Sequence, residues 1–198
     1  MKRLVVGLAG GVGSGKSTVA KILRRLRAAR VIDADAVGHR VLALPAMRRR
    51  LAAIFGPEIL GRGGAIDRRE LARRAFRTRA GQARLNRATH PAILARIRKE
   101  LAAARGWVVL DASLLFESGA DALCDRVIFV DAPAGTREAR TAARGWPPGE
   151  RRRREALQWP PAAKRRKSDA VIDNAGPVAR TERQVRRWLA GLDRPARA

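Results

Sequence analysis

The chain of 198 residues has one cysteine, no tyrosine, few other aromatic residues and few acidic residues. The single cysteine, Cys124, cannot form an internal disulfide, which excludes a small disulfide-stapled fold. No apolar run approaches the ~20 residues that a membrane-spanning helix needs, so we expect no membrane partner. The N-terminal apolar stretch runs straight into a glycine-rich segment and does not have the form of an export signal. We therefore expect the protein to work in a reducing cytoplasm.

The shortage of acidic residues leaves a formal net charge of +25. Nucleic-acid proteins and enzymes that grip phosphate-rich substrates both carry such charge, and so do proteins with arginines scattered over solvated helix faces. The runs Arg151 to Arg154 and Lys164 to Lys167 are able to track the phosphates of a nucleic acid. However, the scarcity of aromatic residues leaves few platforms on which bases stack, and no DNA- or RNA-binding motif occurs. We expect no specific nucleic-acid partner.

The most informative segment fits the phosphate-binding pattern G-x-x-x-x-G-K-[ST]. It consists of Gly10, Gly11, Val12, Gly13, Ser14, Gly15, Lys16 and Ser17, followed by Thr18. A short apolar strand precedes it, and apolar residues at helical spacing follow, so backbone N–H groups and a helix N-terminus surround a polyphosphate. Lys16 is expected to reach the β- and γ-phosphates and Ser17 to bind Mg²⁺. The alternative is a chance glycine-rich turn, but this would not explain why every fixed position of the pattern is present between a strand and a helix. The segment predicts binding of a nucleoside triphosphate.

Strand-like apolar runs that end in aspartate alternate with helical stretches along the chain. The runs end at Asp33, Asp111, Asp131 and Asp173. This order predicts an α/β fold of the P-loop NTPase type, a parallel sheet with helices on both faces. We expect a single domain whose core comprises residues 1–43, 106–144 and 169–192. A helical substrate-binding subdomain is expected over 44–105 and a short helical lid over 145–168.

The phosphate-binding segment and further motifs together resemble the dephospho-coenzyme A kinase family. The motifs are Gly7 to Ser17, Val31 to Asp35, Leu85-Asn86 with His90-Pro91, Leu114 to Glu117, Cys124 to Val127 and Asp169 to Gly176. The resemblance covers almost the whole chain, although Ala9 and Ser113 stand where the family usually has threonine and proline. It implies transfer of the γ-phosphoryl group of ATP to the ribose 3′-hydroxyl of dephospho-CoA, with Mg²⁺ as cofactor. ATP and dephospho-CoA would then be the partners of a monomer or weak homo-oligomer.

The resemblance also suggests roles for single residues. A sugar hydroxyl is a poor nucleophile, and Asp35 falls on the family position of the carboxylate that accepts its proton. Asp33 stays open between substrate contact and helix capping, because alternation along a strand would point both side chains the same way. His90, Leu115 and Glu117 are expected to bind substrate, and Asp111 to hold Mg²⁺.

Two Trp-Pro-Pro steps, at Trp146 and Trp159, interrupt the basic stretch and predict the hinges of the lid, with a helix over 150–158 between them. Lids of this kind exclude water and bring arginines onto the transferring phosphate. By the resemblance, Arg144 is the first candidate for that catalytic role, Arg140 the second and Arg154, on the lid, the third. Asn174 and Gly176 match a loop that borders the adenine. The remaining alternative is another small-molecule or nucleotide kinase of the same fold.

Overall fold

A computed structural model describes residues 3–192, which fall into two compact units. The first comprises the chain up to Ile32 and again from Ala104, and the second comprises Asp33–Ala103. The second unit begins earlier than the range 44–105 expected for the helical subdomain. The difference arises because α2 (Ala34–Leu42) packs along α5 (Arg79–Ala102) and so belongs with the helices.

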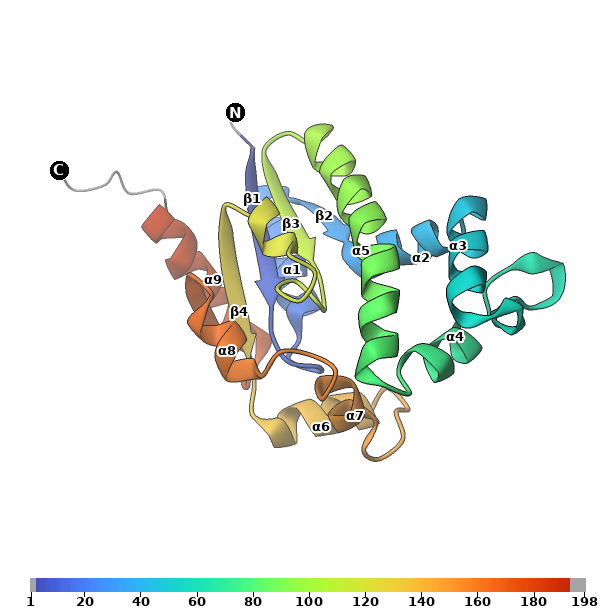
Figure 1. The fold of residues 1–198 in the computed structure, drawn as a ribbon. Coiled ribbons are helices and arrows are strands. Elements are labelled where there is room, and N and C mark those ends of the chain that lie inside the picture. Colours follow the sequence, from blue (N-terminus) through green and yellow to red (C-terminus); the bar gives the residue numbers. More distant parts are fainter. Residues whose placement is uncertain (1–2, 193–198) are drawn as a thin grey trace. The chain divides into compact units, whose positions relative to one another are not determined.

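A five-stranded sheet forms the centre of the first unit (Figure 1). Its strand order is β2-β3-β1-β4-β5. The strands are β1 (Leu4–Ala9), β2 (Arg30–Asp33), β3 (Trp107–Asp111), β4 (Arg126–Asp131) and β5 (Ala170–Asp173). β1 pairs in parallel with β3 and β4, and β4 pairs in parallel with β5. β1, β3 and β4 are nearly continuous apolar runs because both faces of these central strands are covered.

One face of this sheet packs against α1 (Lys16–Arg27) and α9 (Val178–Leu192). Alternate residues of β1, such as Val6 and Leu8, point toward these helices and are fully buried. From the helices, Leu23 and Val185 complete the same core. For α1, this apolar spacing is the signal that predicted the helix from the sequence.

The opposite face of β1 is covered by the segment after β3, which contains the short 3₁₀ helix η3 (Ala120–Leu123). A side chain at Gly7 would collide with Cys124 Sγ at 2.7 Å and Leu115 Cδ2 at 3.0 Å, so this segment lies directly on the strand. Three further helices of this unit follow β4, namely α6 (Ala134–Ala142), α7 (Glu150–Glu155) and α8 (Pro161–Arg166). The predicted α/β fold of the P-loop type is confirmed.

The second unit is helical. Besides α2 and α5 it contains α3 (Pro45–Phe55), η1 (Pro57–Ile59), η2 (Arg62–Gly64) and α4 (Arg68–Ala75). Met47, Leu51 and Phe55 bury one face of α3, and α5 packs against α2, α3 and α4. Among residues 3–192, no helix combines the length and the apolar character that crossing a membrane requires.

The helix predicted over 150–158 is shorter than expected. α7 ends at Glu155, and the amides of Leu157 and Gln158 instead donate to the carbonyls of Arg154 and Glu155 in tight turns. The chain turns here because Pro160 and Pro161 follow and cannot extend the helix.

Candidate active site

The turn between β1 and α1 is the glycine-rich loop, residues 10–15, that the sequence predicts to hold phosphate. Its last residue, Gly15, is the N-cap of α1 and has a left-handed backbone with φ 90°. A Cβ at Gly15 would collide with Asn174 Nδ2, so only glycine fits here. No side chain caps α1, and its first turn carries Lys16 and Ser17 but no acidic residue. The helix end therefore directs amide groups and the positive end of its dipole toward the loop.

Two side chains of the loop are placed for an anionic ligand. Lys16 Nζ lies 3.4 Å from the carbonyl oxygen of Gly10, so the ammonium group stays over its own loop. Ser14 is 1% exposed, and among the described residues its hydroxyl is one of three buried side-chain groups with an atom that has no hydrogen-bond partner. A buried hydroxyl without a partner is costly unless a ligand supplies one. Both observations fit a polyphosphate in the loop.

The residues expected to hold Mg²⁺ are an alcohol and a carboxylate. Ser17 lies in the first turn of α1, and Asp111 ends β3 opposite Leu8 of β1, near the start of the loop. Residues 3–192 contain no group of three or more His, Cys, Asp or Glu side chains able to hold a metal. Mg²⁺ does not need one, because it keeps several waters and binds through one or two protein oxygens plus substrate phosphates. Hard oxygen donors at this place therefore fit Mg²⁺.

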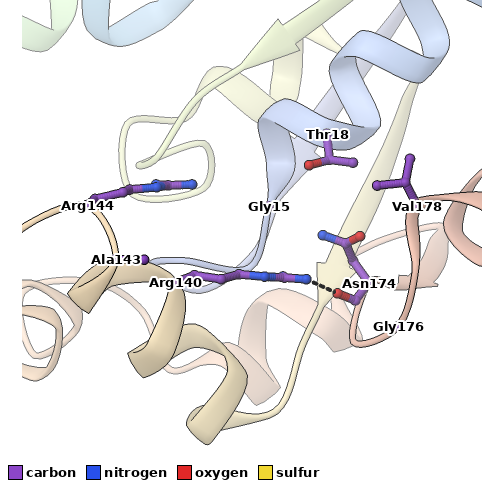
Figure 2. Close-up of a pocket in the computed structure, with 8 residues that line it drawn as sticks. All are labelled: Gly15, Thr18, Arg140, Ala143, Arg144, Asn174, Gly176 and Val178. Carbon is purple, nitrogen blue, oxygen red and sulfur yellow. Dashed lines mark hydrogen bonds between the residues drawn. The ribbon is translucent and has the colours of Figure 1, made fainter.

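Beside the loop lies a cavity of about 400 Å³ (Figure 2). The residues that line it are Gly15, Thr18, Arg140, Ala143, Arg144, Asn174, Gly176 and Val178. They come from the start of α1, from α6 and the turn after it, from the segment between β5 and α9, and from the start of α9. The loop residue Gly15 and the predicted adenine-loop residues Asn174 and Gly176 thus meet at one cavity.

Arg140 and Asn174 hold the phosphate loop from two sides. Asn174 Nδ2 donates to the carbonyl of Ser14 at 2.8 Å, and Arg140 donates to the same carbonyl at 3.2 Å. Arg140 also donates to the carbonyl of Asn174 at 2.7 Å, as Figure 2 shows. Thr181 Oγ1 donates to Asn174 Oδ1 and fixes the amide orientation. The Arg140 guanidinium is thus partly committed to the backbone of the site.

The other two predicted arginines differ in setting. Arg144 follows α6 and lines the cavity (Figure 2). Arg154 lies on α7, where its guanidinium stacks over the Trp146 ring at 4.2 Å and donates to Glu150 at 2.7 Å. Hydrogen bonds from Arg154, with a smaller effect of Arg153, hold the pKa of Glu150 below its usual range. Only Arg144, of these two, belongs to the cavity wall.

Sequence reasoning did not identify two residues that contact the loop. Glu155 accepts a hydrogen bond of 3.0 Å from the amide of Val12, and it pairs with Arg137 of α6. Arg137 stands three residues before Arg140, on the same face of α6, and this spacing is a signal that could have found it. For Glu155 the only local sign is that an acid ends the run of arginines from 151 to 154.

Leu115 and Glu117, predicted to bind substrate, lie in the packed segment after β3. Leu115 is 1% exposed and packs against Gly7. Glu117 Oε1 accepts from the amide of Trp159 at 2.7 Å and pairs with Lys164 Nζ at 2.8 Å. Its Oε2 atom is buried without a hydrogen-bond partner. Glu117 therefore ties the segment around α8 to the core and keeps one oxygen able to accept.

In the second unit, the structure separates the two aspartates that alternation along a strand was expected to align. β2 ends at Asp33, whose Oδ1 accepts from the amide of Ala36 at 2.9 Å and so caps α2. Asp35 lies in the first turn of that helix and is exposed. The strand assumption was wrong because helix formation begins at Ala34. His90 lies within α5, directly before Pro91.

The comparisons with known proteins agree with the geometry of the first unit. A model of the dephospho-CoA kinase family matches residues 4–180. A protein of Corynebacterium diphtheriae named dephospho-CoA kinase is 42% identical over 87% of this chain and 88% of its own length. One of the same name from Deinococcus radiodurans is also 42% identical, over 95% and 92%. The solved structure of TT1252 from Thermus thermophilus is 34% identical, covers 98% of this chain and 100% of its own, and has a TM-score of 0.83. The chain belongs to the dephospho-CoA kinase family.

Proposed function

We propose that this protein transfers the γ-phosphoryl group of ATP to the ribose 3′-hydroxyl of dephospho-CoA, giving CoA and ADP. The observation that carries the proposal is the family match over residues 4–180, which spans the phosphate loop and both units. An enzyme of this family catalyses the final step of CoA biosynthesis. The cytoplasmic location, the monomeric or weakly oligomeric state and the absence of a nucleic-acid partner remain predictions.

In the proposal, ATP lies with its phosphates in the loop and its adenine in the adjoining cavity. The amides of residues 13–18 and the ammonium group of Lys16 bind the phosphates, and the Ser14 hydroxyl gains the partner that it lacks. The cavity of about 400 Å³, lined in part by Asn174, Gly176 and Val178, is large enough for a purine. Ser17 and Asp111 would hold Mg²⁺, which neutralises charge on the phosphates when bound.

The acceptor hydroxyl needs a group that orients it and receives its proton, and we assign this role to Asp35. Asp33 contributes indirectly, since its cap at Ala36 fixes where α2 starts and hence where Asp35 stands. Phosphoryl transfer depends mainly on positioning the reacting groups and on neutralising charge. A carboxylate in the first turn of a capped helix is held in a defined position, and this makes Asp35 suitable as the base.

Arginines complete the proposed site. Arg144 is our first candidate to stabilise charge on the transferring phosphate, because it lines the cavity beside the loop. Arg140 is assigned mainly to holding the Ser14 carbonyl, and Arg154 to a lid formed by residues 145–168. For dephospho-CoA we assign contacts to His90 in the second unit and to Leu115 and Glu117 in the first.

The experiment is a comparison of acceptors. The protein is incubated with ATP and Mg²⁺ and, in separate reactions, with dephospho-CoA, AMP, dCMP or gluconate, and ADP release is followed. We expect turnover with dephospho-CoA and little with the others. Turnover of one of the other three in its place would assign the chain to a different small-molecule kinase activity. Binding of ATP without transfer to any acceptor would contradict the enzyme assignment altogether.

A further inference from the structure

An acidic side chain from α7 reaches the phosphate loop. Glu155 Oε1 accepts a hydrogen bond of 3.0 Å from the amide of Val12, the third position of the loop pattern. The same oxygen pairs with Arg137, and the other carboxylate oxygen, Oε2, pairs with Arg151. Glu155 thus joins the loop, α6 and α7 through one carboxylate.

The contact is close and specific in position. A Cβ built on Gly11 would lie 2.5 Å from the Arg137 guanidinium and 2.7 Å from Glu155 Oε1. The ends of the Arg137 and Glu155 side chains thus lie directly against the second loop glycine. Arg137 is held in this place by a further hydrogen bond of 3.1 Å from its Nε to the carbonyl of Ala132. The guanidinium is therefore anchored beside the loop independently of its contact with Glu155.

The side chains of this cluster are largely shielded from water. Those of Arg137, Arg151 and Glu155 are 12%, 6% and 17% exposed. Arg151 also pairs with Glu138 at 2.6 Å, and Glu138 is 41% exposed. Two guanidinium groups thus share one shielded carboxylate, and partly buried charges of this kind interact strongly because water screens them weakly.

A carboxylate that accepts from a loop amide and a guanidinium resembles one edge of a phosphate group. Both are anions with two oxygens spaced to accept parallel hydrogen bonds, and both favour arginine. The Val12 amide has a single hydrogen, which it already donates to Glu155, and a phosphate brought beside this carboxylate would meet a like charge that repels it. A phosphate that approaches Val12 and Arg137 must therefore displace Glu155.

We propose that Arg137 is a further phosphate-binding residue of the ATP site and that Glu155 is an internal anion which a nucleotide phosphate replaces there. Displacement frees the Val12 amide and the Arg137 guanidinium for ATP and releases the tie between α7 and the loop. Phosphate binding is thereby coupled to movement of the predicted lid. This inference rests on the proposed function insofar as the ligand is a nucleoside polyphosphate.

The test uses two substitutions that break the same ion pair with opposite consequences. Glu155→Gln removes the competing charge, so the dissociation constant for ATP should fall at least about fivefold. Arg137→Gln removes a phosphate ligand, so the same constant should rise at least about threefold. Adenosine carries no phosphate, and its affinity should change by less than about twofold in either variant. Binding of ATP and adenosine is measured by calorimetry on the full chain without acceptor.

Glu138→Gln is the matched control, because it removes an equal charge from Arg151 without touching the loop. It should leave the affinity for ATP within about twofold of the original protein. Thermal unfolding shows whether each variant is folded. If Glu155→Gln does not fold, Glu155→Asp is used in its place. Its shorter side chain should reach the loop less well, so it should also tighten ATP binding.

A merely structural ion pair would make both substitutions shift ATP affinity in the same direction, and that result would overturn the inference. So would equal tightening by Glu138→Gln, which would indicate a general effect of charge. If the unaltered protein does not bind ATP at all, the proposed function fails instead. If it binds ATP and the two variants do not diverge, only this inference fails.

Discussion

Asn174 donates a hydrogen bond of 2.8 Å to the carbonyl of Ser14, which lies 160 positions earlier in the chain. Asn174 is 2% exposed and makes this bond beneath the phosphate loop, where Gly15 leaves room for its amide. The amide of Asn174 in turn donates to the carbonyl of Asp131, at the end of β4. Asn174 therefore fixes the loop to the end of β4, with its side chain on Ser14 and its backbone N–H on Asp131.

Replacing this donor should weaken nucleotide binding. Asn174→Asp keeps the size of the side chain but places a carboxylate against the Ser14 carbonyl, so we expect the dissociation constant for ATP to rise about tenfold or more. Thr181→Val is the control, because it removes only the bond from Thr181 Oγ1 to Asn174 Oδ1. Binding of ATP by the two variants is compared by calorimetry. An equal loss in both would show that general packing, not the bond to Ser14, matters.

The proposed base gives a prediction about rate. Asp35→Asn keeps the shape of the side chain but cannot accept a proton, so kcat for dephospho-CoA should fall about 10²- to 10⁴-fold. ATP affinity should stay within about threefold, because Asp35 is not assigned a phosphate. Initial rates and ATP binding are measured on the same preparation. Asp33→Asn is the comparison: asparagine is also a good N-cap, so kcat should change far less. A variant Asp35→Asn with normal kcat would remove Asp35 from the role of base.

The sequence was sufficient to predict those parts of the site that depend on neighbouring residues. Residues 10–17 cover the turn after a strand and the first residues of a helix, and both elements have local patterns, so the loop and the fold could be predicted. The contact of Glu155 with Val12 spans 143 positions, and no local pattern indicates it. The sequence leaves Asp33 open between substrate contact and helix capping, and the structure shows it as the cap of α2, whereas the role of Asp35 as base stays a proposal. The expectation that both side chains point the same way was wrong, because the strand ends at Asp33, where the hydrogen bond from the Ala36 amide caps the start of α2.

Two aspartates make the same pair of hydrogen bonds between neighbouring strands, which leads to a prediction about stability. Asp125 accepts from the Val5 amide at 2.7 Å and donates its own amide to the Val5 carbonyl at 2.8 Å. Asp169 does the same with Val127, at 2.7 Å and 2.9 Å. Each carboxylate thus satisfies an amide near the start of a central strand, away from the phosphate loop.

We expect Asp125→Ala and Asp169→Ala each to lower the free energy of unfolding by about 1–2 kcal/mol, because a strand amide loses its charged acceptor. Asp125→Asn retains an acceptor oxygen and should lose less. Urea unfolding measures these changes, and the KM for ATP should remain within about twofold, since neither residue is assigned to the site. A KM for ATP that changes by clearly more than about twofold would mean that these residues also shape the site.

Cys124 gives a prediction about pH. Burial, together with the nearby carboxylates of Asp121, Asp125 and Asp169, raises the pKa of its thiol from 9.0 to about 12. In the folded protein the thiol stays neutral at pH 8, and its Sγ lies against Gly7 and donates to the carbonyl of Ala120 at 3.6 Å. Because the thiolate is the reactive form, alkylation by iodoacetamide at pH 8 should be at least about tenfold slower in the folded chain than in urea.

The raised pKa of Cys124 also sets the direction of a stability change with pH. The neutral thiol stabilises the fold fully below pH 9, and this contribution is lost as the pH rises from 9 toward 12. Cys124→Ser has no group that ionises in this range, so its melting temperature should fall less steeply above pH 9 than that of the original protein. Rapid alkylation at pH 8, or parallel melting curves for the two proteins above pH 9, would contradict a thiol held neutral by its surroundings.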